Sequence, residues 1–316
     1  MKQRWLNVIR VLISIGALAF LFWKIGLGET LDVLRRADMR YLLVAFLLVV
    51  LGLVIRACRW FVLLRGLALD VTWGRLMHLY FVGAFFNSFL PTGFGGDVVR
   101  ALELSGDTDS SAAVGTVLLD RMSGLLVLFA MGLIALPFTL TRLDPWLAGL
   151  LVGVAGGGLI AGALVLEGRF LQRVTDRLPT ALSLRGEGFL AQVYAAVTGC
   201  GRRALLEALG ISIIFNVVNV LVNWLCGLAV GIPQGPGFYF IVTPLISVTL
   251  LVPLSISGLG VRDWVTVALF SSVKVDANTA AAMSLSIYLV SAAAGLLGGL
   301  LYGIEGLRGL RRQEPV

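Results

Sequence analysis

The stretch that decides the fold is Asn87–Arg100, with the sequence NSFLPTGFGGDVVR. It begins inside an apolar run, breaks that run with Pro91 and three glycines, and then supplies Asp97 and Arg100. The chain around it is 58% hydrophobic, with a mean hydropathy of +0.95. Irregular backbone and ionisable groups at membrane depth are tolerated only where protein buries them or a wet cavity receives them. This stretch is therefore the first candidate for a functional site.

The composition is that of an integral membrane protein. Charged residues make up 14% of the chain, and several apolar runs reach the roughly 20 residues that cross a bilayer. The longest polar stretch, 167–203, is the size of a connecting loop with a short helix. We therefore expect one membrane domain over 1–316 and no soluble enzyme domain within it.

Several classes of function find little support in the composition. The net charge of +7 comes from short basic clusters beside apolar runs, which the positive-inside rule explains without nucleic acid. Cys58, Cys200 and Cys226 lack metal-binding spacing, and His78 is the only histidine. A Walker loop and a nucleophile elbow are both missing. We expect no cofactor, no metal and no catalytic residue.

Basic residues also give the orientation, because loops rich in lysine and arginine stay in the cytoplasm. The N-terminus, the segment 167–203 and the tail at 308–312 each carry several of them. Arg56 and Arg59, near the end of the apolar run 41–63, are interpreted as anchors on the same side. We expect an inner-membrane protein with both termini in the cytoplasm.

Six apolar runs are long enough to be full spans. The first resembles a signal peptide, but it continues through Phe20–Trp23, so we expect an uncleaved helix. The predicted spans are 6–26, 41–63, 112–140, 146–166, 204–231 and 279–304.

Two further apolar segments, 76–110 and 238–273, are each broken in the middle. Loop charge places both ends of the first on the cytoplasmic side and both ends of the second on the opposite side. Each segment therefore predicts a re-entrant hairpin, the first bending near Pro91 and the second at Pro253–Gly260.

The order of span, broken hairpin and span then occurs twice in inverted orientation. The two halves are 41–140 and 204–304, joined by a cytoplasmic loop with an amphipathic helix at 167–203. Interrupted segments at corresponding positions of inverted halves point to the binding site of a transporter. The predicted fold class is an all-α polytopic membrane protein with two broken hairpins arranged as inverted repeats.

The first break offers a site for an anion. Gly93, Gly95 and Gly96 allow a ligand or another helix to come close, and Asp97 is placed as the N-cap of a short helix. In one interpretation Asp97 only caps this helix and Arg100 pairs with Asp97 or with Glu103 three residues on. In the other, Arg100 and the free N–H groups of the helix start hold an anionic headgroup such as phosphate.

The second break repeats the arrangement. Gly258, Gly260, Arg262 and Asp263 could bind the same ligand or form an interfacial ion pair. The pair Asp120 and Arg121 begins a long span, where it could contact ligand, snorkel, or pair with the first hairpin.

Asparagines supply the remaining candidates. Asn216, Asn219 and Asn223 share one face of the run 204–231, where they could bond to a neighbouring helix or line a hydrated path. Asn87, at the edge of the first break, is a further candidate for a cavity lining.

Three motifs carry a family resemblance: Leu90–Arg100, Leu119–Leu125 and Ser257–Asp263. In order and spacing they resemble the lysylphosphatidylglycerol synthase transmembrane-region family, also called flippase-like proteins, from about Asn7 to Leu307. The resemblance implies kinship with the half of a bifunctional enzyme that moves an aminoacylated phospholipid across the bilayer. The aminoacyl-transferring domain of that enzyme has no counterpart in this sequence, so lysyl transfer is not expected. The substrate does not carry over with the fold.

Three hypotheses follow. The protein translocates or binds a membrane phospholipid or other polar lipid; it is a membrane-embedded enzyme or accessory subunit in lipid or lipid-linked glycan synthesis; or it is a scaffold for lipid-synthesis enzymes. Inverted broken hairpins favour the first, because a scaffold does not need them. The scarcity of nucleophile–base pairs disfavours the second.

Overall fold

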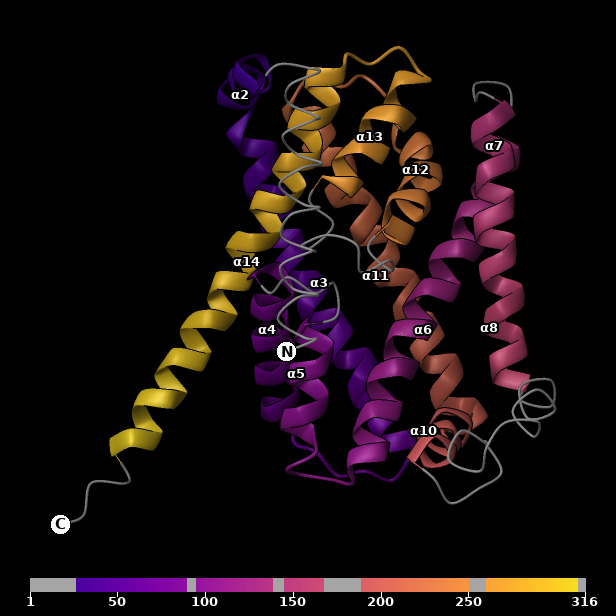
Figure 1. The fold of residues 1–316 in the computed structure, drawn as a ribbon, viewed down its shortest axis with the longest axis vertical. Helices are drawn as coiled ribbons and strands as arrows, with labels where there is room; N and C mark the ends of the chain where they lie inside the picture. Colours follow the sequence, from indigo (N-terminus) through magenta and orange to yellow (C-terminus); the bar gives the residue numbers. More distant parts are fainter. Residues whose placement is uncertain (1–26, 90–94, 139–144, 168–188, 250–259, 312–316) are drawn as a thin grey trace, which may run out of the picture.

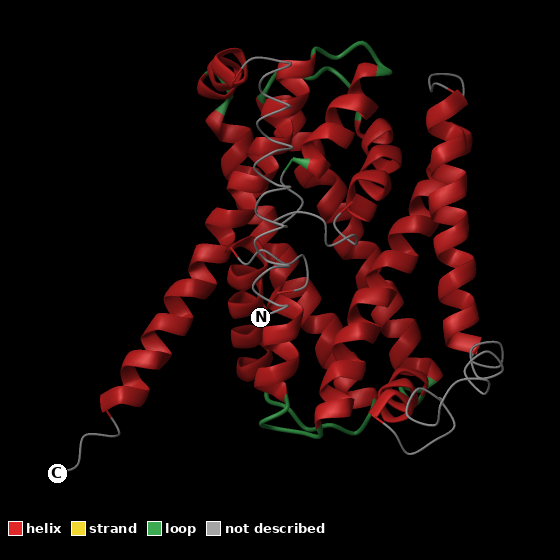
Figure 2. Ribbon diagram, in the orientation of Figure 1, coloured by secondary structure: helices red, strands yellow, loops and turns green. Residues whose placement is uncertain are grey.

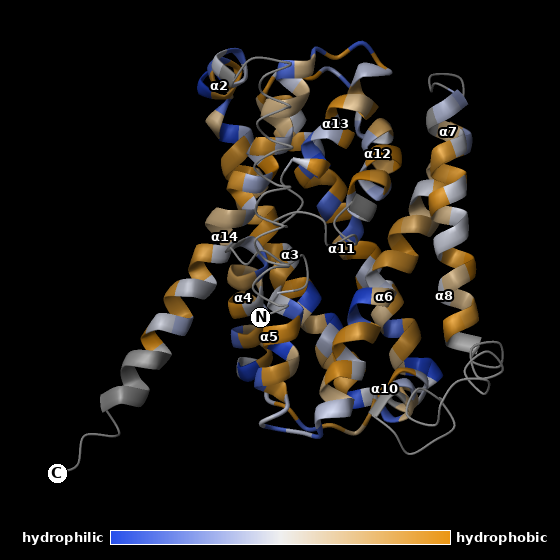
Figure 3. Cartoon of the chain, viewed as in Figure 1, coloured by the Kyte–Doolittle hydropathy of each residue, from blue (hydrophilic) through white to orange (hydrophobic). Residues whose placement is uncertain are grey.

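The protein is an all-α membrane protein. A computed structural model describes residues 27–89, 95–138, 145–167, 189–249 and 260–311, and within these ranges it contains helices and no β-strand (Figure 2). In a membrane protein, apolar side chains that face lipid are not covered by other parts of the fold. Ile160 and Leu300 are in keeping with this, since each is about two-thirds exposed. Figure 3 shows hydrophobic residues along α8 (Gly157–Glu167) and along the part of α14 (Ala277–Arg311) that is coloured, as expected for surfaces in contact with lipid.

Within the described residues, five helices are long and apolar enough to cross a membrane, by length and composition. Each lies where a span is predicted, whereas the predicted first span, 6–26, falls outside the described residues. Four of them are single helices: α3 (Met39–Gly66), α6 (Ser110–Ala135), α11 (Arg202–Ala229) and α14 (Ala277–Arg311). The fifth is a continuous helix made of α7 (Pro145–Leu151), a π-helical turn (Val152–Gly156) and α8 (Gly157–Glu167).

Local capping explains where two of these spans begin. The Asp38 side chain accepts a hydrogen bond from the amide of Arg40 at the start of α3. Asp109 caps α6 by accepting from the Ser111 and Ala112 amides. The hydrogen bond from the Ser111 hydroxyl, followed by the one from the Ala112 amide, lowers the pKa of the Asp109 carboxyl, so this cap is charged at neutral pH.

The two broken segments form pairs of short helices. The first pair is α4 (Trp73–Phe89) and α5 (Gly95–Leu104), and the second is α12 (Pro236–Thr249) and α13 (Val261–Ser271). In Figure 1, α4 and α5 lie in the lower half of the molecule, and α12 and α13 lie in the upper half. This is the placement expected of hairpins that enter from opposite sides. The bends themselves, 90–94 and 250–259, lie outside the described residues, and the full span count and the repeat symmetry stay predictions.

Two short helices lie at the ends of the bundle. Helix α2 (Leu27–Arg35) was not predicted, and it packs on α14 through hydrogen bonds from Thr30 to Asn278 and from Asn278 to Glu29. A helix, α10 (Phe189–Thr198), lies in the segment for which an amphipathic helix was predicted. Its residues Val193 and Val197 are buried, so much of its apolar face packs on protein and not on a lipid surface.

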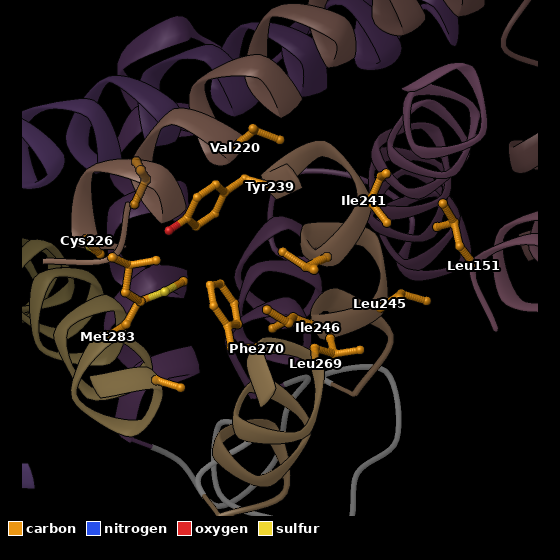
Figure 4. Close-up of a cluster of buried hydrophobic side chains, with 14 of the residues drawn as sticks. Leu151, Val220, Cys226, Tyr239, Ile241, Leu245, Ile246, Leu269, Phe270 and Met283 are labelled. Carbon is orange, nitrogen blue, oxygen red and sulfur yellow. The ribbon is translucent and has the colours of Figure 1, made fainter. Parts of the chain in front are cut away.

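The main hydrophobic core lies in the upper half, where the second hairpin meets α11 and α14. Figure 4 shows Tyr239 and Phe270 at its centre, with ring centroids 5.7 Å apart, beside Cys226 and Met283. A second cluster around Trp60, Leu76 and Tyr80 joins α3 to α4 in the lower half.

Candidate functional site

Asp120 is the centre of a buried network that joins four helices. This α6 carboxylate is 2% exposed, and it accepts hydrogen bonds from Arg59 Nε of α3 at 2.7 Å and from Arg100 Nη2 of α5 at 3.0 Å. It also accepts a hydrogen bond from the hydroxyl of Tyr80 on α4. Of the roles considered for Asp120, pairing with the first hairpin is the one observed.

Asp97 extends the network. It pairs with Arg100 Nη1 at 3.3 Å and with Arg121 of α6. The prediction that Asp97 is the N-cap of the short helix is wrong, because α5 begins at Gly95 and places Asp97 in the first turn. From there its carboxylate reaches the arginines and remains favourably placed at the positive end of the helix.

Glu103, the other partner considered for Arg100, lies elsewhere. It pairs with Arg75 at 3.0 Å, and Asp107 pairs with the same guanidinium at 3.1 Å. Arg100 is instead buried between carboxylates and rings, with its guanidinium carbon 4.1 Å from the centroid of Trp60 and 3.8 Å from that of Tyr80. Such stacking stabilises a guanidinium away from water.

Arg56 and Arg59 are not the cytoplasmic anchors that the sequence analysis made them. Both lie within the spanning helix α3, and Arg59 is 3% exposed and bound to Asp120. Arg56 has no carboxylate partner among the described residues, and its Nε is buried without a hydrogen bond. Its guanidinium lies 5.6 Å from the ring centroid of Tyr80 and 5.1 Å from that of Phe215.

These groups line a central cavity with two lobes. We call the first the arginine lobe, of about 340 Å³, and the second the asparagine lobe, of about 360 Å³. The lobes adjoin, because they share lining residues from α3, α6, α13 and α14: Val49, Arg56, Arg59, Arg121, Arg262 and Ser291.

The cavity brings together most of the polar candidates of the sequence analysis. The arginine lobe is lined by Asn87, Asp97, Arg100, Asp120, Arg121 and Arg262. The asparagine lobe is lined by Asn216, Asn219 and Asn223. Gly93 and Gly258 lie outside the described residues, and Gly95, Gly96, Gly260 and Asp263 are absent from the described lining.

Gly96 supports the site by close packing. A Cβ added there would lie 1.9 Å from the carbonyl oxygen of Gly83 on α4. The Gly96 amide donates to Asn87 Oδ1 at 2.8 Å. Since only glycine permits this approach, Gly96 holds α5 against α4 and keeps Arg100 at its depth in the bundle.

The second hairpin holds Arg262 by different means. Gly260 has a φ of +83°, a conformation that favours glycine, and its amide donates to Asp263 Oδ2 at 2.9 Å. Arg262 donates to Ser284 Oγ at 3.2 Å and to the Ser284 carbonyl at 3.1 Å. Its ion pair with Asp263 is long, at 3.5 Å.

Asn216 supplies the interhelical bond that was considered for the asparagine stripe. Asn216 Nδ2 donates across to the Gly124 carbonyl of α6 at 3.0 Å and to the Ser212 carbonyl at 2.9 Å. Asn223 Nδ2 donates to the Asn219 carbonyl of its own helix. All three asparagines also line the cavity.

Sequence reasoning missed Arg56, Arg59, Trp60 and Tyr80 as parts of the site. A signal was available for the two arginines, which lie one turn apart inside a 28-residue apolar helix. Ionisable residues within a span are functional candidates by default. Among the described residues, no cluster of His, Cys, Asp and Glu side chains could hold a metal ion.

Residues 7–299 match the model of the lysylphosphatidylglycerol synthase TM region. The chain belongs to this family. The family match covers the whole described bundle except its C-terminal end.

Three relatives are archaeal proteins named only as UPF0104 membrane proteins. The one from Methanothermobacter thermautotrophicus is 27% identical over 90% of this chain and 91% of its own length. The one from Methanocaldococcus jannaschii is 22% identical over 92% of this chain and 90% of its own. The match to the Pyrococcus horikoshii protein, at 27% identity, is partial: 42% of this chain and 40% of that protein. Their names give no substrate.

Proposed function

We propose that this family member binds and translocates a lipid with an anionic, phosphate-containing headgroup. The observation that carries the proposal is Arg56, a guanidinium in an intramembrane cavity with no carboxylate partner among the described residues. Arg56 is half-buried, and a cation partly withdrawn from water without a paired anion is costly. A phosphate group in the cavity would offset that cost.

The charge balance of the arginine lobe supports the same ligand. Its described lining residues include five arginines (Arg56, Arg59, Arg100, Arg121 and Arg262) and two aspartates, Asp97 and Asp120. Guanidinium groups suit phosphate because their planar N–H donors match its oxygens. The headgroup would occupy the cavity between the half-length hairpins while the acyl chains stay in the bilayer.

The alternative, a membrane-embedded enzyme in lipid or lipid-linked glycan synthesis, would need a carboxylate free for acid–base chemistry. Asp97 and Asp120 are each engaged by two arginines, which favours a binding role over proton transfer. An accessory role beside lipid-synthesis enzymes would be compatible with lipid translocation. We place the protein in the cytoplasmic membrane, with both termini in the cytoplasm.

Reconstitution tests the proposal. The purified protein is placed in vesicles with a tail-labelled anionic phospholipid, and movement between leaflets is followed by quenching of the outer label. Wild type is expected to accelerate movement over empty vesicles, and Arg56→Gln to lose most of that acceleration, about tenfold or more. Arg65→Gln is the matched control, since Arg65 is exposed near the end of the same helix and stacks on Phe61.

The outcomes separate the hypotheses. Equal rates in wild-type and empty vesicles, together with no retention of anionic lipid by the purified protein, would remove the proposal. A chemically altered lipid recovered from the vesicles would favour the enzyme. Equal loss in Arg56→Gln and Arg65→Gln would show that the effect does not come from the cavity.

A further inference from the structure

The two lobes differ in the charge that they offer. The described lining of the asparagine lobe includes arginines but no acidic residue. The arginine lobe has Asp97 and Asp120, and both are already engaged by arginines at the wall. In the described lining of the cavity, every carboxylate is therefore already paired with arginines. A cationic group of a ligand would find no free carboxylate there.

The asparagine lobe offers neutral hydrogen-bonding groups instead. The side chain of Asn219 makes no hydrogen bond within the described residues, and Thr243 Oγ1 is buried without a partner. Asn216 uses its Nδ2 group for two backbone carbonyls, which leaves its Oδ1 as an acceptor. Unpartnered polar atoms that line a cavity are expected to find partners in a ligand or in water.

We infer that the cavity selects lipids whose headgroup combines a phosphate with an uncharged, hydroxyl-bearing part, and that it discriminates against headgroups with a cationic amine. The inference rests on the proposed function and deepens it. The phosphate would lie against Arg56 in the arginine lobe, and the hydroxyl-bearing part would reach Asn219 and Thr243 in the asparagine lobe. Hydroxyls suit these groups because they both donate and accept hydrogen bonds.

The inference separates this chain from the lipid in its family's description. A lysylated headgroup carries ammonium groups, which would face Arg56, Arg121 and Arg262 across the shared wall of the two lobes. Like charges placed together in a desolvated site oppose binding strongly. Specificity of this kind comes from a repulsive element as much as from an attractive one.

A competition experiment tests the inference with the full chain. Purified protein is exposed to mixed micelles with equal amounts of phosphatidylglycerol, phosphatidylethanolamine and lysylphosphatidylglycerol, and the retained lipids are measured by native mass spectrometry. Wild type is expected to retain phosphatidylglycerol over lysylphosphatidylglycerol by at least about tenfold. Phosphatidylethanolamine, whose amine offsets its phosphate, is expected to lie between them.

Two variants at one position report on the asparagine lobe. Asn219→Asp adds a carboxylate to the lobe that the arginines line. It is expected to admit the lysylated lipid and so to reduce the preference for phosphatidylglycerol over lysylphosphatidylglycerol by about tenfold. Asn219→Leu, of similar size, is expected to lower retention of phosphatidylglycerol without any gain of the lysylated lipid. Thermal unfolding of each variant confirms that it is folded.

The results distinguish this inference from the proposed function. If wild type retains lysylphosphatidylglycerol as well as phosphatidylglycerol, and Arg56→Gln lowers both, the selectivity is wrong and the lipid site stands. If Asn219→Asp and Asn219→Leu give the same lipid profile as wild type, the asparagine lobe does not contact the headgroup and the inference falls. If no lipid is retained above a detergent background and Arg56→Gln changes nothing, the proposed function fails together with the inference.

Discussion

The two hairpins carry similar sequence patterns and use them differently. In the first, Arg100 is 4% exposed, pairs with carboxylates on α5 and α6, and stacks on two rings. In the second, Arg262 is 6% exposed and relies on a long ion pair with its neighbour Asp263 and on two hydrogen bonds to Ser284. The first pattern ties several helices into one charged network, whereas the second fastens a hairpin to α14.

The glycines of the two hairpins also differ in their structural role. Gly96 of the first hairpin is required for a close approach of α5 to α4. Gly260 of the second is required for a positive φ at the start of α13. A glycine motif shared by two inverted segments therefore does not imply a shared physical role, and substitutions can measure how far the roles differ.

The largest effect is expected from Asp120→Asn. The change leaves Arg59 and Arg100 buried with a neutral partner, and breaking a buried ion pair costs about 3–5 kcal/mol. Thermal or denaturant unfolding in detergent measures the loss. Asp107→Asn, which weakens only a partly exposed pair with Arg75, is the control and is expected to cost about 1 kcal/mol or less. Similar losses in the two variants would contradict a central role for Asp120.

The next largest effect is expected from Gly96→Ala, which should lower the free energy of unfolding by about 2–3 kcal/mol. The added methyl group would collide with the Gly83 carbonyl and push α5 away from α4. Lipid retention should fall as well, since Arg100 moves with α5. The control is Gly210→Ala in α11, where an added Cβ meets nothing within 4 Å. That variant should be neutral or slightly stabilising, and a stable Gly96→Ala protein would show that the hairpin is loosely packed.

Asp263→Asn is expected to cost less, about 1–2 kcal/mol. It weakens the cap on the Gly260 amide, but Arg262 keeps its two hydrogen bonds to Ser284. Unfolding of Asp263→Asn and of Asp120→Asn, measured under the same conditions, gives the ratio of their losses in unfolding free energy. A loss as large as that of Asp120→Asn would mean that the two hairpins depend equally on their carboxylates, and the comparison above would fail.

Much of the bundle is predictable from composition and spacing. The five described spans follow from apolar length alone, and Pro91 and Pro253 locate the two breaks, because proline and glycine interrupt helices. The polar residues near those breaks, such as Arg100 and Arg262, are also the ones that line the cavity. The sequence therefore predicts which polar residues lie at the breaks in the apolar segments.

The partners were harder to predict. The hydrogen bond from Arg59 to Asp120 spans 61 positions, and that from Tyr80 to Asp120 spans 40. A rule that assigns arginines near the end of a span to the cytoplasm cannot detect a carboxylate on another helix. Helix α2 was missed for the same reason, because the Thr30 hydrogen bond to Asn278 crosses 248 positions.

The smallest effect on stability is expected where the largest effect on function is proposed. Arg56→Met should leave the free energy of unfolding unchanged or raise it by up to about 1 kcal/mol, because it removes a half-buried charge that has no carboxylate partner among the described residues. Arg59→Met, one turn further along α3, should lower it by about 3 kcal/mol, since it leaves Asp120 with one fewer guanidinium. Unfolding measured with and without anionic lipid separates the two arginines: added lipid should stabilise wild type more than Arg56→Met. If Arg56→Met unfolds as easily as Arg59→Met, then Arg56 is a structural member of the network and does not wait for a ligand.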